Sequence, residues 1–190
     1  GLGTEAGNSL VSHPDVNKVT FTGSVETGKI VGRTAVEQMK RFTLELGGKS
    51  PIIIRQDANI EAAIFGASMA IFFNQGQTCT AGSRLYIHKS IFDEVVSGVA
   101  KFAENINVQP GYDAACGMGP LVSAEQRDRV FGFIKSGIEE GAEVMTGGTQ
   151  LDGNGYFIAP TVLKTKQNMK VVQEEIFGPV VCAMPFDDDD

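Results

Sequence analysis

The sequence contains no tryptophan and only three cysteines and two histidines among 190 residues. Cys79, Cys116 and Cys182 are odd in number and far apart, and they form no CxxC motif. Neither a disulfide framework nor a cysteine-based zinc site is therefore indicated. His13 and His88 have no ligand-type neighbours along the chain. We expect no metal site, and thiols that stay reduced in the cytoplasm.

Long hydrophobic runs are also missing. The longest, such as residues 52–54 and 70–73, fall far short of a membrane span, and no signal peptide opens the chain. The net charge is −7, the isoelectric point is near 4.9, and lysine and arginine do not cluster. These features argue against nucleic acid and anionic membranes as partners.

Hydrophobic residues (42%) and charged residues (21%) occur at the frequencies of an ordinary globular domain. Strands are expected at residues 18–22, 43–46, 51–54, 84–88, 143–145, 156–163 and 180–186. Helices are expected after residue 24, over 60–73 and 91–105, and from about 124 to 140. The helix over 60–73 is rich in alanine and glycine and is expected to be packed on all sides. The caps of these helices would be Ser24, Asp57 or Asn59, Ser90 with Asp93, and Ser123 with Gln126. This alternation predicts an α/β fold with a doubly wound, mostly parallel sheet.

Two glycine-rich segments could contact phosphate. Residues 23–30 match the P-loop pattern except at Ile30, where a P-loop has a serine or threonine whose hydroxyl binds magnesium. A nucleoside triphosphatase is therefore not indicated. A strand, a turn and a helix N-terminus remain, which suit either a phosphate or a plain capped helix. Residues 1–7 resemble the dinucleotide-binding pattern GxGxxG, but three residues rather than two separate the later glycines. A glycine-rich loop fits them better.

Cys79 lies in a polar, glycine-containing loop, residues 74–80, after an apolar helix. Core cysteines seldom occur in such a loop, whereas catalytic thiols do. Cys182 lies in an apolar run and fits a buried position, and Cys116 has no assigned role. A cysteine hydrolase that uses His13 or His88 as base is disfavoured, because neither lies in a recognisable partner motif.

Two acidic residues interrupt otherwise apolar patterns. Glu45 stands near the end of the strand over 43–46, where it either faces solvent or serves as a general base at the ligand-binding end of the sheet. Glu175 opens the segment Glu-Ile-Phe-Gly-Pro, which ends at Pro179. This rigid turn either directs an acid and Phe177 into a cleft or is a plain turn with Phe177 in the core.

These motifs together resemble those of the NAD(P)-dependent aldehyde dehydrogenase superfamily. Four segments occur in the order and spacing of that family: 21–28, 44–51, 76–79 and 175–179. The resemblance covers essentially the whole chain. Around Cys79 and His88 the sequence is most similar to the betaine-aldehyde and phenylacetaldehyde dehydrogenase branch.

The resemblance implies that Cys79 attacks an aldehyde to give a thiohemiacetal and then a thioester, and that Glu45 activates the water that hydrolyses it. It implies NAD as cofactor, with NADP not excluded. The implied cofactor contacts are Gly23, Ser24 and Gly28 for the pyrophosphate, Gly3 and Gly7 for the adenosine half, Leu46 for the nicotinamide, and Glu175 and Phe177 for the ribose and nicotinamide.

The resemblance also implies that residues 1–48 end a Rossmann-type cofactor domain and that residues 49–190 form a catalytic domain. Members of the family are longer at both ends and form homodimers or homotetramers, and this chain starts at Gly1 rather than at methionine. We therefore expect a truncated chain whose parent oxidises aldehydes. Alone, these 190 residues would reduce little NAD and keep only thiol reactivity or weak thioesterase action.

Overall fold

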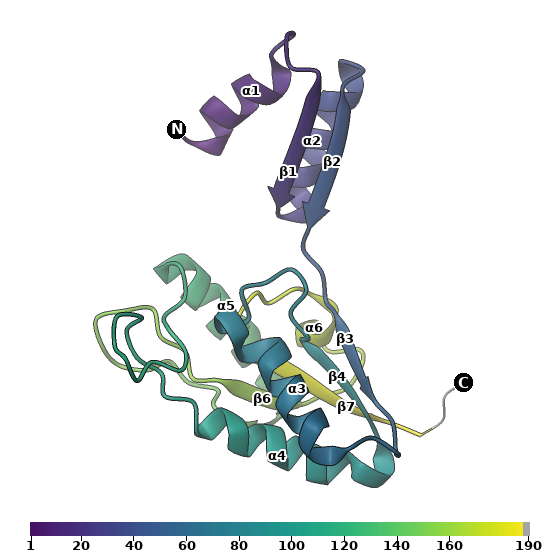
Figure 1. Cartoon of the computed structure of the whole chain (residues 1–190), viewed down its shortest axis with the longest axis vertical. Helices are drawn as coiled ribbons and strands as arrows, with labels where there is room; N and C mark the ends of the chain where they lie inside the picture. The colour runs from purple at the N-terminus through teal and green to yellow at the C-terminus, as the bar shows by residue number, and fades with distance from the viewer. Residues whose placement is uncertain (188–190) are drawn as a thin grey trace. The chain divides into compact units, whose positions relative to one another are not determined.

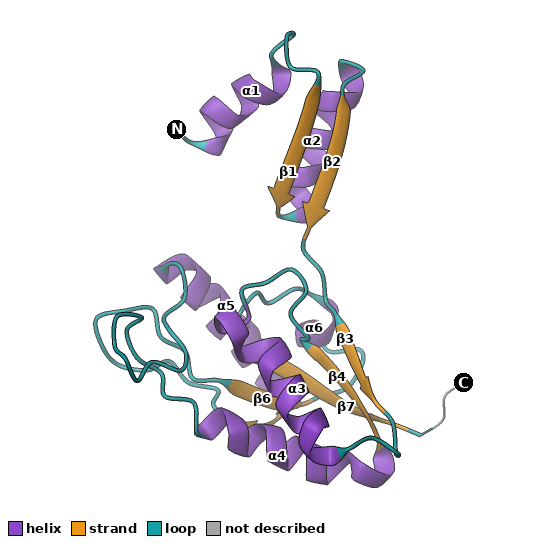
Figure 2. Ribbon diagram, in the orientation of Figure 1, coloured by secondary structure: helices purple, strands orange, loops and turns teal. Residues whose placement is uncertain are grey.

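A computed structural model describes residues 1–187 of the chain. These residues form two compact units, the first from Gly1 to Gly47 and the second starting at Gly48. The predicted boundary lies one residue later, after Gly48. Figure 2 shows helices and strands alternating in both units. None of the helices in residues 1–187 has the length and hydropathy of a membrane span.

The first unit is built on two parallel strands, β1 (Lys18–Gly23) and β2 (Arg41–Leu46). They are joined by α2 (Val25–Glu37), whose N-cap is Ser24 as predicted: its hydroxyl accepts a hydrogen bond from the Thr27 amide at 3.2 Å. Alternate side chains of β2 pack on this helix, which brings Leu44 and Leu46 against Gly32 and Gly28. The intervening Glu45 points to the other face of the strand pair and is exposed.

The start of the chain is helical, so the expectation of a glycine-rich loop there is wrong. Gly3–Gly7 forms a π-helical turn, η1, which continues into the α-helix α1 (Asn8–Ser12). The amides of Glu5 and Ala6 donate to the Leu2 carbonyl and start the turn. Side-chain hydroxyls then bond to carbonyls four residues back, as Ser9 does to Glu5 at 2.8 Å.

The second unit contains a five-stranded sheet with strand order β3-β4-β7-β6-β5. The strands are β3 (Pro51–Ile54), β4 (Arg84–His88), β5 (Glu143–Thr146), β6 (Thr161–Lys164) and β7 (Val180–Phe186). All neighbours are parallel except β5 and β6, which are antiparallel. The mostly parallel α/β sheet expected from the sequence is thus confirmed.

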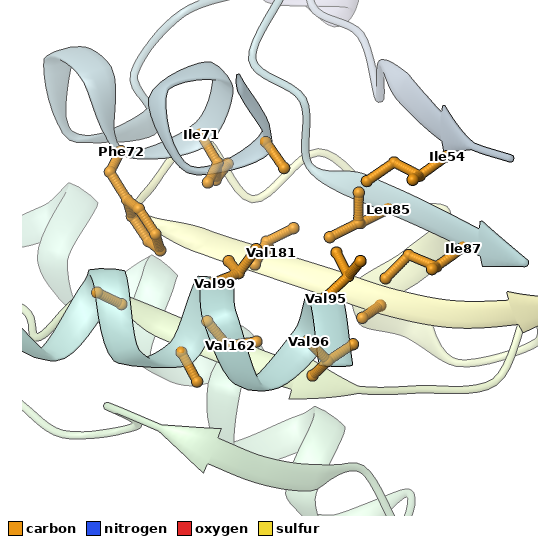
Figure 3. Close-up of a cluster of buried hydrophobic side chains, with 14 residues drawn as sticks. Ile54, Ile71, Phe72, Leu85, Ile87, Val95, Val96, Val99, Val162 and Val181 are labelled. Atoms are coloured by element: carbon orange, nitrogen blue, oxygen red, sulfur yellow. The ribbon is translucent and has the colours of Figure 1, made fainter. Parts of the chain in front are cut away.

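Helices cover both faces of this sheet, which makes it doubly wound. Helices α3 (Ile60–Phe72) and α4 (Phe92–Glu104) pack side by side on one face. Their core contains Ile71 and Val99 together with Leu85 and Val181 of the sheet (Figure 3). On the other face α5 (Ala124–Glu139) and α6 (Lys170–Gln173) close a second core around Ile134. Short 3-10 turns, η2 (Phe73–Gly76) and η3 (Lys89–Ile91), complete the elements.

Two of the predicted caps of this unit are confirmed and one is wrong. The Asn59 side chain accepts from the Ala62 amide at 3.0 Å, and the Ser123 hydroxyl accepts from the Gln126 amide at 3.1 Å. Ser90 does not cap α4, because it lies inside η3. The Ser90 hydroxyl instead pairs with His88 Nδ1 at 2.7 Å.

Two further expectations about the second unit need correction. The strand expected over residues 156–163 begins only at Thr161, since Pro160 has no amide hydrogen for a sheet ladder. Helix α3 was expected to be buried on all sides, but Phe65 and Met69 on one of its faces are exposed. Met69, together with Gly66 and Ala70 of the same helix, lines a cavity described below.

Candidate functional site

Cys79 lies on a loop whose backbone is held in an unusual conformation. Asn74, Gln75 and Gly76 have successive φ values of 50°, 57° and 67°, in the left-handed region. Such a conformation costs roughly 1–3 kcal/mol for each residue other than glycine and persists only where the surroundings impose it. Here the Asn74 side chain donates to the Gln77 carbonyl at 3.1 Å.

The strained segment leads directly into a tight turn that presents the thiol. The Ala81 amide donates to the Thr78 carbonyl at 3.0 Å, so Cys79 stands at the outer corner of that turn and is exposed. The Gln77 side-chain oxygen accepts from the Val122 amide at 3.1 Å and ties the loop to the segment before α5. The thiol is therefore accessible while its backbone is fixed, as a nucleophile requires.

A cavity of about 400 Å³ opens beside this turn. It is bounded by Thr78 and Thr80, the two neighbours of Cys79, and by the exposed apolar face of α3. The lining residues are Gly66, Met69, Ala70, Phe73, Thr78, Thr80 and Ala81. Its size and largely apolar lining fit the organic part of a small ligand.

The segment from Glu175 to Gly178 packs against the Cys79 loop. A Cβ atom at Gly76 would lie 2.1 Å from the Gly178 carbonyl oxygen, so the two backbones touch at a position that only glycine can occupy. The Glu175 carboxylate accepts a hydrogen bond from the Gly48 amide at 3.1 Å. Phe177 has φ 58°, a rare conformation for an aromatic residue.

Helix α5 holds the same segment from the other side. Gln126 Nε2 donates to the carbonyl oxygens of Ile176 at 3.2 Å and Phe177 at 2.8 Å. Arg129 Nη2 donates to the Glu175 carbonyl at 2.7 Å. The sequence suggested Gln126 only as a capping-box partner of Ser123, and Arg129 carried no signal at all. Both were missed because every residue has a backbone carbonyl, so the sequence does not indicate which carbonyl a side chain bonds to.

Glu45 belongs to the first unit and stands at the carboxyl end of β2, next to the last residue of the strand. It pairs in register with Thr22 of β1, on the face of the strand pair opposite α2. Glu45 thus faces solvent by alternation and lies at the strand end where ligands gather in open α/β sheets, and its role as a general base stays a prediction.

The predicted phosphate and adenosine contacts also lie in the first unit. Ser24 caps the N-terminus of the 13-residue helix α2, whose first amides and dipole favour an anion. Gly3 and Gly7 line a cavity of about 590 Å³ together with Phe21 and residues of α2. No heavy atom lies within 4 Å of a Cβ placed at either glycine, so these two positions border open space.

Two predicted contacts turn out to have packing roles. A Cβ atom at Gly28 would lie 2.5 Å from Leu46 Cδ2, so this glycine allows α2 to approach β2 closely. Gly23 likewise faces the Phe21 ring, 2.6 Å from where its Cβ would be. Cofactor contacts by Gly23, Gly28 and Leu46 stay predictions.

The other titratable candidates are engaged elsewhere. Cys182 is buried in β7, its thiol donates to the Val171 carbonyl at 3.3 Å, and burial raises the pKa of the thiol to about 11. The Cys116 thiol donates to the Gln109 carbonyl at 3.1 Å. His88, besides its contact with Ser90, packs edge-on against Phe186. Lys49, which was not a candidate, is also buried, and this burial lowers the pKa of its amino group.

Comparison with known proteins gives one consistent answer. The whole chain, residues 1–190, matches the aldehyde dehydrogenase family. It is 46% identical to a mitochondrial aldehyde dehydrogenase of Leishmania tarentolae over 192 aligned residues, which cover 100% of this chain and 39% of that protein. It is 45% identical to the phenylacetaldehyde dehydrogenase of Pseudomonas fluorescens, with 99% of this chain and 38% of that protein covered.

A solved structure agrees with these relatives. The NAD+ complex of an aldehyde dehydrogenase from Bacillus cereus superposes with a TM-score of 0.98 at 47% identity, covering 100% of this chain and 39% of that one. The chain thus spans about two fifths of the length of the proteins that it matches. Because one relative is mitochondrial, the cytoplasmic location stays a prediction. The oligomeric state also stays a prediction.

Proposed function

Because this chain belongs to the aldehyde dehydrogenase family, we propose that it serves the NAD-dependent oxidation of an aldehyde to a carboxylic acid, with Cys79 as the nucleophile. One observation carries the proposal. The Cys79 thiol is exposed on a backbone fixed by left-handed residues, directly beside a cavity that can take an organic side chain.

The Cys79 thiolate adds to the aldehyde carbon, and the carbonyl oxygen becomes the oxyanion of a thiohemiacetal. The Cys79 amide supplies part of the stabilisation of that oxyanion. The carbon then loses a hydride, and a thioester remains on Cys79. Covalent attachment keeps the acyl group in place until water can reach it. Thr78 and Thr80 border the cavity in which the rest of the aldehyde lies.

Glu45 is the base for the second half of the reaction. It removes a proton from the water that attacks the thioester, which releases the carboxylic acid and the free thiol. Only Leu46 and Gly47 separate it along the chain from Gly48, the residue that bonds to Glu175. An exposed carboxylate at a strand end is accessible to that water.

The first unit fits the adenosine and phosphate parts of NAD. Its cavity of about 590 Å³ has the size and apolar lining of a nucleoside site, and Gly3 and Gly7 leave it open. The N-terminus of α2 at Ser24 suits the pyrophosphate. Glu175 would accept hydrogen bonds from the nicotinamide ribose, and Phe177 would pack against the nicotinamide ring. When bound, NAD supplies the hydride acceptor.

A second function needs no cofactor. Because the second unit by itself contains the exposed Cys79 and its cavity, it could hydrolyse activated esters or thioesters weakly. The thiol would attack the ester, and water would release the acyl group.

One experiment separates the two functions. The protein and its Cys79→Ala variant are incubated with NAD and an aldehyde panel that includes phenylacetaldehyde and betaine aldehyde, and NADH is followed by absorbance. NADH formation that disappears in the variant supports aldehyde oxidation, whereas formation that persists refutes the role of Cys79. Cys79-dependent hydrolysis of p-nitrophenyl acetate without NADH formation supports the second function.

A further inference from the structure

Lys40 is a buried cation of the first unit, with only 9% of its surface exposed. It follows the C-terminus of α2, where Met39 turns the chain with φ 53° and the Lys40 amide donates to the Ala35 carbonyl at 2.9 Å. From this turn the Lys40 ammonium donates to the carbonyl oxygens of Val11 at 2.7 Å and His13 at 2.6 Å. Both hydrogen bonds are charge-assisted and short, which places them among the stronger ones in proteins.

The two carbonyls lie at the C-terminal end of α1, a helix of five residues that ends at Ser12. Even with the five residues of η1 before it, a helix this short is not stable without contacts to the rest of the protein. The last carbonyls of a helix lack partners within it and form the negative end of its dipole, so a cation stabilises them. Lys40 therefore fastens the end of α1 to the start of β2.

The position of α1 matters because this helix and η1 form one wall of the cavity of about 590 Å³. Residues between Leu2 and Val11 line that wall, and Phe21 and α2 line the rest. Val11 belongs to both features, since it lines the cavity while its carbonyl accepts the hydrogen bond from Lys40. Lys40 is not among the described residues that line this cavity, so it acts on a ligand there only through α1.

We infer that Lys40 is a positioning residue that sets the affinity for the adenosine half of the cofactor by holding α1 in place as a wall of this cavity. The inference rests on the proposed function, in which the cavity binds that half. Cys79 belongs to the second unit, so the loss of Lys40 leaves the reactivity of the thiol unchanged.

Binding of ADP, which contains only the adenosine half, tests this role by calorimetry. Lys40→Met keeps most of the length of the side chain but removes the donors that hold α1. The helix then occupies its place for only part of the time, and the apparent affinity falls with that fraction. Loss of two charge-assisted hydrogen bonds weakens ADP binding about tenfold or more, while the rate of Cys79 alkylation by iodoacetamide stays within twofold of wild type.

Two further variants separate positioning from a general loss of stability. Lys40→Arg keeps a charged donor and recovers most of the ADP affinity. Leu44→Ala removes packing against Gly32 of α2, outside the lining of the cavity, so it weakens the unit but leaves ADP binding within twofold of wild type. ADP affinity within twofold of wild type in Lys40→Met overturns the inference. So does an equal loss of affinity in Leu44→Ala, which marks a general structural defect.

Hydrogen–deuterium exchange without ligand keeps this result distinct from that of the proposed function. Wild-type protein that does not bind ADP refutes the adenosine site, and exchange over residues 8–13 then decides the role of Lys40 alone. Faster exchange there in Lys40→Met than in Leu44→Ala supports a lysine that holds α1, and equal exchange overturns it. Where Lys40→Met does not fold, Lys40→Gln, which has a neutral amide in place of the ammonium, replaces it in both comparisons.

Discussion

Gly76 and Gly178 touch through their backbones, although 102 residues separate them in the chain. A Cβ atom on Gly76 would lie 2.1 Å from the Gly178 carbonyl oxygen and 3.0 Å from that of Ile71, and the φ of Gly76 is 67°. The loop that ends at Cys79 is thereby seated on the segment that begins at Glu175. Cys79 and the segment with Glu175 and Phe177, proposed to bind the nicotinamide half of NAD, therefore depend on the same glycine contact.

Gly76→Ala should displace the Cys79 loop. The new methyl group meets backbone rather than a side chain that can rotate away, so we expect the protein to lose about 2–4 kcal/mol of unfolding free energy. We also expect a different alkylation rate at Cys79. Urea unfolding and iodoacetamide labelling measure the two effects. Gly132→Ala on α5 is the control, because its Cβ meets nothing within 4 Å and should leave stability equal or slightly higher.

The three thiols should react with iodoacetamide in the order Cys79, Cys116, Cys182. Cys79 is exposed, Cys116 is partly buried and bonded to Gln109, and Cys182 is buried. Since alkylation requires contact with the thiolate, Cys79 should be labelled at least about tenfold faster than Cys182. Peptide mass spectrometry at short reaction times gives the three rates. In 8 M urea the rates should converge, and equal rates in the folded protein would refute an accessible Cys79.

Much of the fold was predictable because its elements carry local signals. The apolar strands over 51–54, 84–88 and 180–186 have the bounds that the sequence indicated. Asn59 and Ser123 cap helices as expected, because a polar side chain before an apolar helix has few other roles. The errors occurred where non-local contacts compete with these signals. The Ser90 hydroxyl, for instance, pairs with His88 rather than with the helix that follows.

The candidate site was predictable only where chemistry needs a particular side chain. Cys79 and Glu45 stood out because a thiol in a polar loop and a carboxylate in an apolar strand both violate the ordinary pattern. The hydrogen bonds from Gln126 and Arg129 to residues 175–177 could not be foreseen, because they reach carbonyls about 50 residues away, and any residue supplies a carbonyl. The packing role of Gly28 was hidden for a similar reason, since it depends on Leu46 in another element.

The buried thiol of Cys182 should make stability fall at alkaline pH. Its pKa is about 11 in the folded protein against an ordinary 9.0, so only the unfolded chain loses this proton between those values. Stability is unaffected below pH 9 and then falls by about 1.4 kcal/mol per pH unit, to a loss of about 3 kcal/mol at pH 11. Burial lowers the pKa of Lys49, which acts in the opposite direction. Urea unfolding across this pH range compares wild type with Cys182→Ser, and parallel pH curves would contradict the prediction.

Replacing Glu45 with glutamine should separate the two halves of the proposed reaction. Glutamine has nearly the same size but cannot take a proton from water, so thioester formation on Cys79 continues while hydrolysis slows. With NAD and an aldehyde that the wild-type protein is found to oxidise, rapid mixing should show a burst of NADH close to one per Cys79. A steady rate about 10²–10⁴-fold below wild type should follow. Glu37→Gln, an exposed acid at the end of α2, should behave like wild type. A burst reduced as strongly as the steady rate would place Glu45 before thioester formation, because a base needed only for hydrolysis cannot slow the first turnover.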